Sequence, residues 1–518
     1  MSEPLSDSLR KIARGTGIAM VGLLIGLLFQ FFARLIIARY GLQANYGIFS
    51  LAWTVLNFSM ILACLGIDQG ATRCIAYFRS RREVNKVHGT ISASLQLATG
   101  ASIIISAVIF FSARAIALNI FHTDDLVPAL RIFAIGIPFL TLINILVGIF
   151  RGFDKMEPQA YFHFILLNIL FLLPLLALIL VELPFIIVFY AYLGALILTF
   201  IALAVYTVKK LPRLITSTSG KADISVRKDL LSLSLPLLST AMFSMVIFSM
   251  DTIMLGYFKT SETVGLYNAA YPLAYLISVP LYALGLIYTP VATGLYSQNL
   301  MAELRRNYTI LTKWLNFLTL PIFLVLCLFP EATLDLFFGS AYVASAPALR
   351  ILSLGFIIRN LFGPNANTLL AIGESRFIMW SVSTAAIMNI LLNIVLIPPL
   401  GIVGAATASA VSLNLTSIIM SVKLYSSCRA QPLSKNLLKP LLSSIVLVFL
   451  FQFIIGSFLT VTLWILPLLF ILYYVVYCTA TVLTRSFDRE DIALLLEIEK
   501  RSGINAEPLK KILSKFVQ

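Results

Sequence analysis

The chain has 518 residues and a formal net charge of +15, and 59% of its residues are hydrophobic whereas only 12% are charged. Soluble domains carry charge on about a quarter of their residues, so this composition, with a mean hydropathy of +0.95, excludes an ordinary soluble protein. The hydrophobic runs are about 20 residues long, as membrane-spanning helices require, and are not the ten-residue alternations of a membrane β-barrel. The sequence therefore predicts an all-α polytopic membrane protein.

The apolar runs predict about fourteen transmembrane helices. In chain order they lie near residues 16–38, 45–66, 88–111, 127–150, 161–181, 184–208, 230–258, 264–288, 310–329, 348–372, 377–397, 401–421, 440–459 and 462–483. The intervening segments, such as 67–87, are interpreted as loops. Five cysteines fall within or beside the runs without paired spacing, so neither a disulfide framework nor a metal site is predicted.

The loop charges predict the orientation. With the N-terminus in the cytoplasm, 30 of the 38 Lys and Arg residues fall on the cytoplasmic side, 5 on the opposite side and 3 within spans. Positive residues near span ends are retained in the cytoplasm. We therefore expect a multi-pass protein of the cell (plasma or inner) membrane with both termini cytoplasmic. A nucleic-acid partner is not expected, because it would need a soluble basic domain.

Three pairs of positions recur at nearly one spacing, which indicates an internal repeat. Gly47 and Gly265 are 218 residues apart, Leu130-Arg131-Ile132 and Leu349-Arg350-Ile351 are 219 apart, and Asn168 and Asn389 are 221 apart. Such a repeat is typical of transporters, whose substrate site lies between the two halves.

The repeat gives a domain plan of two pseudosymmetric six-helix bundles with additions. The expected parts are an N-terminal bundle (1–208), a cytoplasmic linker (209–229), a C-terminal bundle (230–426), two additional transmembrane helices (427–484) and a cytoplasmic amphipathic tail (485–518). Seven basic residues in the tail suit contact with anionic headgroups, although a plain solvated tail explains them equally well.

Several short motifs in a fixed order resemble the polysaccharide biosynthesis and oligosaccharide flippase family. The first half has Lys11-Ile12-Ala13-Arg14-Gly15, Arg34, Ile37-Ala38-Arg39, Tyr46-Gly47, Gly66-Ile67-Asp68 and Thr72-Arg73; the second has Asp251 to Gly256, Val264 to Ala270, Phe338-Gly339 with Tyr342, and Gly401 to Ala406. The resemblance covers nearly the whole chain. It implies the multidrug/oligosaccharidyl-lipid/polysaccharide exporter superfamily, in which two bundles surround a central cavity and a lipid-linked glycan crosses by alternating access. Among the arginines that hold the lipid's phosphates in the related lipid II flippase, the resemblance matches only Arg34.

Charges within spans are the first candidates for the substrate site, because a charge at a helix centre costs about 2.5 to 3.5 kcal/mol on insertion scales. Arg34 and Asp251 occupy corresponding places in the two repeats and are expected to pair in at least one state. The pair would be a gate or a site that an anion opens by displacing Asp251. A fixed structural bridge, or snorkelling to the interface, is the alternative.

Arg359 lies about twelve residues into the tenth span and is followed by Asn360, Pro364 and Asn365. Proline frees a backbone carbonyl inside a span, which predicts a broken helix with polar neighbours. Transporter sites commonly lie at such breaks, so Arg359, Asn360 and Asn365 are predicted to line the cavity. The alternative is that Arg359 caps the freed carbonyls.

Two asparagines in corresponding spans, Asn168 and Asn389, are candidates to present amides to sugar hydroxyls, with His163 and Asn393 beside them. Polar side chains in spans more often join helices to one another. Asp68 and Arg73 are expected to pair at headgroup level.

The favoured function is a flippase that moves a polyprenyl-(pyro)phosphate-linked oligosaccharide from the cytoplasmic to the outer leaflet for surface polysaccharide or glycan assembly. A cation-coupled multidrug antiporter of the same superfamily would need a cavity carboxylate such as Asp251. A membrane glycan polymerase or ligase is disfavoured by the short extracytoplasmic loops. No catalytic residue, cofactor or metal is expected, while coupling to H⁺ or Na⁺ stays open. The expected partners are the lipid-linked oligosaccharide, membrane lipids and glycan-assembly proteins.

Overall fold

The computed structural model describes residues 3–210, 224–432, 443–444, 446–447, 450 and 466–483. Within these residues the secondary structure is helical, with no strand. The prediction of an all-α protein is confirmed. The predicted tail (485–518) and most of the predicted linker and of the thirteenth span lie outside the described residues.

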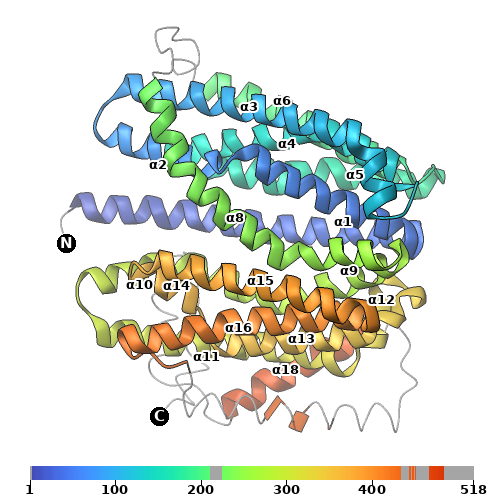
Figure 1. Cartoon of the computed structure of the whole chain (residues 1–518). Helices are drawn as coiled ribbons and strands as arrows, with labels where there is room; N and C mark the ends of the chain where they lie inside the picture. Colours follow the sequence, from blue (N-terminus) through green and yellow to red (C-terminus); the bar gives the residue numbers. More distant parts are fainter. Residues whose placement is uncertain are drawn as a thin grey trace. The chain divides into compact units, whose positions relative to one another are not determined.

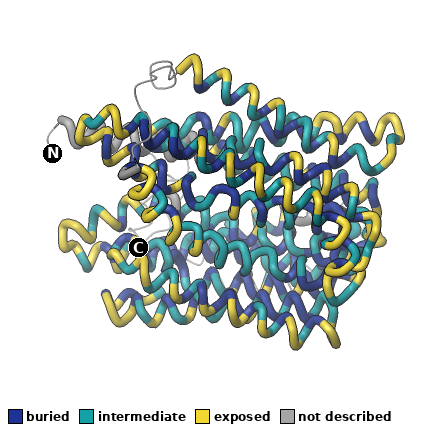
Figure 2. The backbone as a smooth tube through the Cα atoms, turned by 45° about the horizontal axis from the view of Figure 1, so that its top comes forward, coloured by how far each residue is buried: buried dark blue, intermediate teal, exposed yellow. Residues whose placement is uncertain are grey.

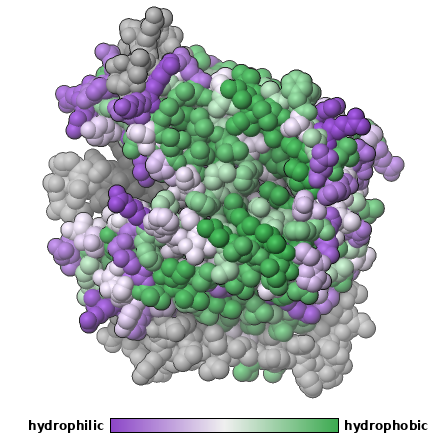
Figure 3. Space-filling view, in the orientation of Figure 1, coloured by the Kyte–Doolittle hydropathy of each residue, from purple (hydrophilic) through white to green (hydrophobic). Residues whose placement is uncertain are grey.

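Eleven helices in the described part are long and apolar enough to cross a membrane. The first of them, Met20–Ser80, includes two predicted spans, which meet at a kink in α1 (Glu3–Cys64) at Leu42, whose φ is 59°. Twelve of the predicted spans are therefore present as apolar helices, and α18 (Leu466–Leu483) covers the last one. Figure 3 shows hydrophobic side chains along the middle of the helices and hydrophilic ones toward their ends. The chain is a multi-pass membrane protein.

One compact unit comprises Arg14–Asn268. Besides most of α1, its helices are α2 (Ile67–Ser80), α3 (Val84–Ala115), α4 (Leu126–Gly152), α5 (Leu167–Val181), α6 (Ile187–Lys210), α8 (Ile224–Phe258) and the first half of α9 (Ser261–Tyr275), with π-helical segments η1 (Ile116–Ile120) and η2 (Gln159–Leu166). Helix α4 contacts α2, α3 and α6 (Figure 1) and is mostly buried. Figure 2 shows that exposed residues are most frequent at the ends of the helices. Aromatic rings from several helices fill the core around Phe49, Phe133 and Tyr192.

The second unit comprises Ala269–Gln518 with Met1–Ala13. Its described elements are the rest of α9, η3 (Leu276–Ser278), α10 (Val279–Ser297), α11 (Met301–Leu328), α12 (Pro330–Phe338), η4 (Ser340–Ser345), α13 (Ala346–Leu361), α14 (Asn365–Ala371), α15 (Ser375–Leu400), α16 (Ile402–Cys428) and α18. Helix α16 contacts α13, α14 and α15, and α18 contacts α11. One core cluster centres on Tyr308 and Leu369.

One predicted feature is wrong and two are confirmed. The segment predicted as the loop 67–87 contains the helix α2, which was missed because its buried residues recur every three or four positions among polar and charged ones, so its average hydropathy is low. The predicted span 264–288 is present as an apolar helix that includes the 3₁₀ segment η3. The break predicted at Pro364 is confirmed, since α13 ends at Leu361 and α14 begins at Asn365, with Gly363 between them at a φ of 63°.

Candidate functional site

Asp251 lies on α8 in the first unit and is 1% exposed. Its carboxylate accepts a hydrogen bond from the hydroxyl of Tyr267 on α9. The next residues on both helices are also joined, because the amide of Asn268 donates to the hydroxyl of Thr252 over 3.2 Å. Arg34 is half-buried on α1, and its pairing with Asp251 stays a prediction.

A close crossing between α1 and α9 lies beside this cluster. A Cβ atom added to Gly47 would be 1.7 Å from the carbonyl oxygen of Ser261, and one added to Gly265 would be 2.0 Å from that of Gln43. Both the glycines and the residues they contact are 218 positions apart. The two contacts are therefore reciprocal, as two copies of one repeat related by a pseudo-twofold axis would make them.

Arg359 lies in the second unit, near the end of α13. Its Cζ atom is 5.7 Å from the centre of the Tyr282 ring, and that ring is 5.8 Å from the ring of Tyr275. The Nη1 atom of Arg359 is buried without a hydrogen-bond partner among the described residues, and no carboxylate there forms an ion pair with the guanidinium. An unsatisfied buried donor is costly, more so when it is charged. The site is thus suited to an anionic group.

The four predicted asparagines make protein contacts in this structure. The amide of Asn360 donates to the carbonyl of Ile277 in η3 over 2.8 Å. Asn365 donates to the carbonyl of Ser417 and to the hydroxyl of Ser421, both over 3.0 Å. The Asn360 bond reaches η3, and the Asn365 bonds join α14 to α16, so both side chains hold helices together in this conformation.

Asn389 and Asn168 are also engaged. Asn389 is fully buried and accepts a hydrogen bond from Asn393 over 3.1 Å, and Asn168 donates to the carbonyl of Phe164 over 2.7 Å. His163 lies in the π-helical segment η2, and its Nδ1 atom is buried without a partner among the described residues. Presentation of these asparagine amides to a sugar stays a prediction for another conformation.

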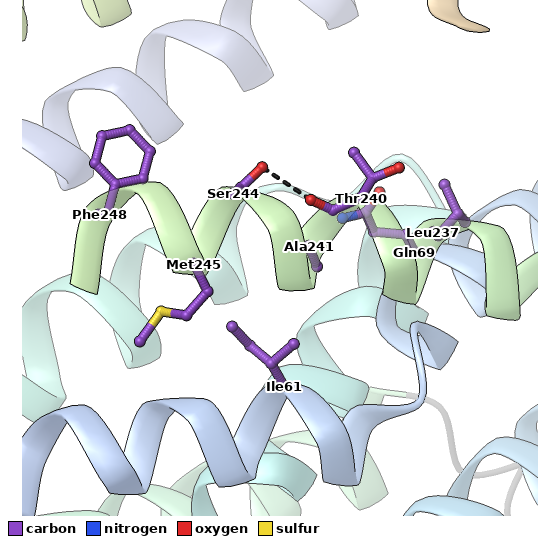
Figure 4. A pocket seen from close by; sticks show the side chains of 8 residues that line it. All are labelled: Ile61, Gln69, Leu237, Thr240, Ala241, Ser244, Met245 and Phe248. Carbon is purple, nitrogen blue, oxygen red and sulfur yellow. Dashed lines mark hydrogen bonds between the residues drawn. The ribbon is translucent and has the colours of Figure 1, made fainter. Parts of the chain in front are cut away.

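A cavity lies elsewhere, against α8 of the first unit (Figure 4). It has a volume of about 390 Å³ and is lined by Ile61, Gln69, Leu237, Thr240, Ala241, Ser244, Met245 and Phe248. A smaller compartment of about 100 Å³ adjoins it, shares four of these residues and adds Met60, Cys64, Gly66, Asp68, Asn144 and Leu238. We call the two compartments together the α8 pocket.

The α8 pocket adjoins a break in the chain between α1 and α2. Leu65 and Gly66 both have positive φ, 50° and 71°, and a Cβ on Gly66 would lie 2.2 Å from the carbonyl oxygen of Ser234 on α8. Asp68, in the first turn of α2, is 3.8 Å from Arg151, whereas Arg73 is exposed. The predicted Asp68–Arg73 pair is therefore wrong. In the sequence, Gly66 and Asp68 at the end of the second predicted span were the features that could have indicated this pocket.

The sequence matches the family described as polysaccharide biosynthesis protein over residues 12–292, more than half of the chain. The chain belongs to this family. A second family, MatE, matches residues 236–395. The predicted resemblance is confirmed.

Two curated relatives extend this result. The teichuronic acid biosynthesis protein TuaB of Bacillus subtilis is 28% identical over 155 residues, 30% of this chain and 32% of that protein. The probable low-salt glycan biosynthesis flippase Agl15 of Haloferax volcanii is 24% identical over 170 residues, 33% of this chain and 36% of that protein. The matches span about a third of the length of these relatives.

Two solved structures share the fold of the present protein. The lipid II flippase MurJ in an inward closed conformation aligns with a TM-score of 0.70 at 16% identity, covering 89% of this chain and 98% of that one. An inward-facing multidrug resistance MATE family transporter of the MOP superfamily aligns with a TM-score of 0.65 at 17% identity, covering 80% and 98%. At these identities the likeness shows the fold alone.

Proposed function

We propose that this protein is a flippase for a polyprenyl-(pyro)phosphate-linked oligosaccharide, acting by alternating access from the cytoplasmic to the outer leaflet. Its family, a relative described as a probable glycan biosynthesis flippase and the fold it shares with MurJ support this function. The loop charges favour cytoplasmic termini. In this proposal the protein is a transporter and catalyses no covalent step.

The observation that carries the proposal is the environment of Arg359. A guanidinium presents a planar fork that matches two phosphate oxygens, and it stays charged when partly desolvated. Its buried Nη1 atom has no protein partner in the described part, and the tyrosine rings beside it supply no opposite charge. A phosphate of the carrier lipid satisfies this donor and brings the missing charge.

The test compares three variants in reconstituted vesicles. Arg359→Ala and Arg359→Lys should each slow glycolipid translocation at least about tenfold, because lysine cannot bind bidentately. Arg350→Ala is the matched control. Arg350 lies on the same helix but is exposed and already pairs with Glu331 over 2.8 Å, so its loss should leave transport within about twofold of wild type.

Thermal unfolding separates this role from a structural one. Stable but inactive Arg359 variants support phosphate binding. Normal translocation by Arg359→Ala would remove the residue from the site, and unfolding of that variant at a clearly lower temperature would favour the capping role near Pro364.

The cation-coupled multidrug antiporter remains the second candidate. It is favoured by the match to the MatE family and by a buried carboxylate, Asp251, in the first unit. The Tyr267 hydroxyl already stabilises that carboxylate, so the antiporter requires the bond to break in each cycle. Efflux of a cationic dye by the wild type, lost in Asp251→Asn, would identify this function.

A further inference from the structure

The α8 pocket lies close to the middle of a transmembrane helix. From Leu237 to Phe248 its lining extends over twelve residues of α8, about 16 Å of helix. The break at Leu65–Gly66 lies at one end of this lining, because Gly66 approaches the backbone of Ser234 and Leu238. The larger compartment of the α8 pocket, at about 390 Å³, lies within the range of about 300–1,000 Å³ that small-molecule sites occupy.

The charge of the lining excludes phosphate as the occupant. None of the described residues that line either compartment is a lysine or arginine, and Asp68 is the ionisable acid among them. A phosphate placed here would meet the Asp68 carboxylate. The cation beside it, Arg151, does not line the pocket and lies 3.8 Å from that carboxylate. An electrically neutral ligand fits, and it is a different part of the substrate from the one assigned to Arg359.

The polar groups of the lining are those that bind hydroxyls. Gln69 is exposed at the pocket, and Asn144 donates to the carbonyl of Leu140 over 2.9 Å, so its amide oxygen is left as an acceptor. Thr240 and Ser244 donate to carbonyls of their own helix over 3.2 Å and 2.9 Å. Their oxygens keep lone pairs that accept further hydrogen bonds.

The remaining walls are apolar and come from two helices. Figure 4 shows Ala241 and Met245 of α8 pointing toward Ile61 of α1, with Phe248 at one end and Gln69 beside Thr240 at the other. A sugar ring has apolar C–H faces and a rim of hydroxyls, and this lining has both counterparts. An isoprenoid chain would instead bury the Gln69 amide without a hydrogen-bond partner, which is costly.

We propose that the α8 pocket is a binding site for a neutral sugar unit of the translocated glycan. The inference rests on the proposed function and adds where the glycan binds. Sugar hydroxyls hydrogen-bond to Gln69, Asn144 and Asp68, and a ring face packs on Ile61 and Met245. The phosphate-linked end of the lipid is recognised elsewhere.

Direct binding is tested by thiol protection, which requires no transport. Purified full-length Gln69→Cys is labelled with a small maleimide, with wild type as background for the native cysteines. Maltose, lactose and chitobiose at millimolar concentration should slow the labelling at least about threefold, and farnesyl phosphate, a carrier-like lipid without sugar, should not. Ser239→Cys is the matched control, because Ser239 is exposed on α8 and does not line the pocket.

The outcomes decide between occupants. Protection by the disaccharides at position 69 but not at 239 supports the sugar site. Protection by farnesyl phosphate alone would assign the pocket to the lipid chain and overturn the proposal. If none of the three disaccharides slows labelling of Gln69→Cys, the proposal is overturned as well.

Transport supplies the second arm. Ser244→Phe fills the pocket, and Gln69→Leu removes its amide; both should slow translocation of a lipid-linked oligosaccharide at least about tenfold while binding of farnesyl phosphate, followed by thermal shift, is retained. Ser239→Phe should transport within about twofold of wild type. Wild-type rates in both pocket variants would refute the sugar site. Failure of wild type itself to move any glycolipid would refute the proposed function while the thiol protection result stands by itself.

Discussion

Replacement of Gly47 by alanine tests the reciprocal crossing of α1 and α9. A Cβ atom there would lie 1.7 Å from the Ser261 carbonyl oxygen, whereas real Cβ atoms essentially never approach within 3.0 Å. The two backbones must therefore separate by about 1.3 Å, and neither atom belongs to a flexible side chain. Overpacking of this kind costs about 1–3 kcal/mol. A cost of 2 kcal/mol shifts an equilibrium away from this conformation by roughly 30-fold.

Two other glycines provide controls with the opposite expected sign. Gly100 on α3 and Gly194 on α6 have no atom within 4 Å of an added Cβ. Alanine is favoured over glycine within a helix by about 1 kcal/mol, so Gly100→Ala and Gly194→Ala should unfold at the same temperature as wild type or higher. Gly47→Ala and Gly265→Ala should each unfold at a lower temperature, measured on purified protein in one detergent.

The double variant Gly47→Ala with Gly265→Ala adds a test of reciprocity. Once the first alanine has separated the helices, the second should cost less than it does alone, so the two losses should not add. Unfolding of Gly47→Ala at the temperature of Gly194→Ala would refute the close crossing, and strict additivity would refute the shared contact.

Three further predictions follow from other parts of the chain. The charge swap Arg34→Asp with Asp251→Arg should recover part of the transport lost in each single variant, whereas additive loss would argue against the pair. Reporter fusions after Lys209 and after Arg485 should both show a cytoplasmic location, and an extracytoplasmic signal at either point would contradict the fourteen-span topology. Asn365→Leu should lower the free energy of unfolding by about 1–3 kcal/mol, because it removes both hydrogen bonds that the Asn365 amide donates to α16; unchanged thermal stability would contradict that role.

The sequence predicted the architecture well because the strongest signals in a membrane chain are long apolar runs. These signals fail where a helix is amphipathic. Helix α2 has Ile67, Ile75 and Phe78 buried and charged residues on its other side, so hydropathy averaged over a window suggested a loop. The break at Pro364 was predictable from proline chemistry, while the one at Leu65–Gly66 depends on a close approach to α8 that no local pattern reveals.

The candidate sites were predictable to a lesser extent. Arg359 became a candidate because a charge within a span needs a partner, and the structure leaves its Nη1 atom buried without one in the described part. The role of Asn365 depended on which groups lie opposite it, and those are on α16, some fifty residues away. The α8 pocket combines residues of α1, α2, α4 and α8. Such a combination follows from tertiary packing and not from spacing along the chain.

The central claim is that the substrate is an anionic glycolipid and not a lipophilic cation. Vesicles containing the purified protein are loaded in parallel with a fluorescent polyprenyl-diphosphate oligosaccharide and with a cationic dye, and appearance of each in the opposite leaflet or outside the vesicles is followed over time. We expect the protein to accelerate glycolipid translocation at least about tenfold over empty vesicles, and to leave dye efflux unchanged with or without an H⁺ or Na⁺ gradient. Gradient-driven dye efflux without glycolipid translocation would contradict the account.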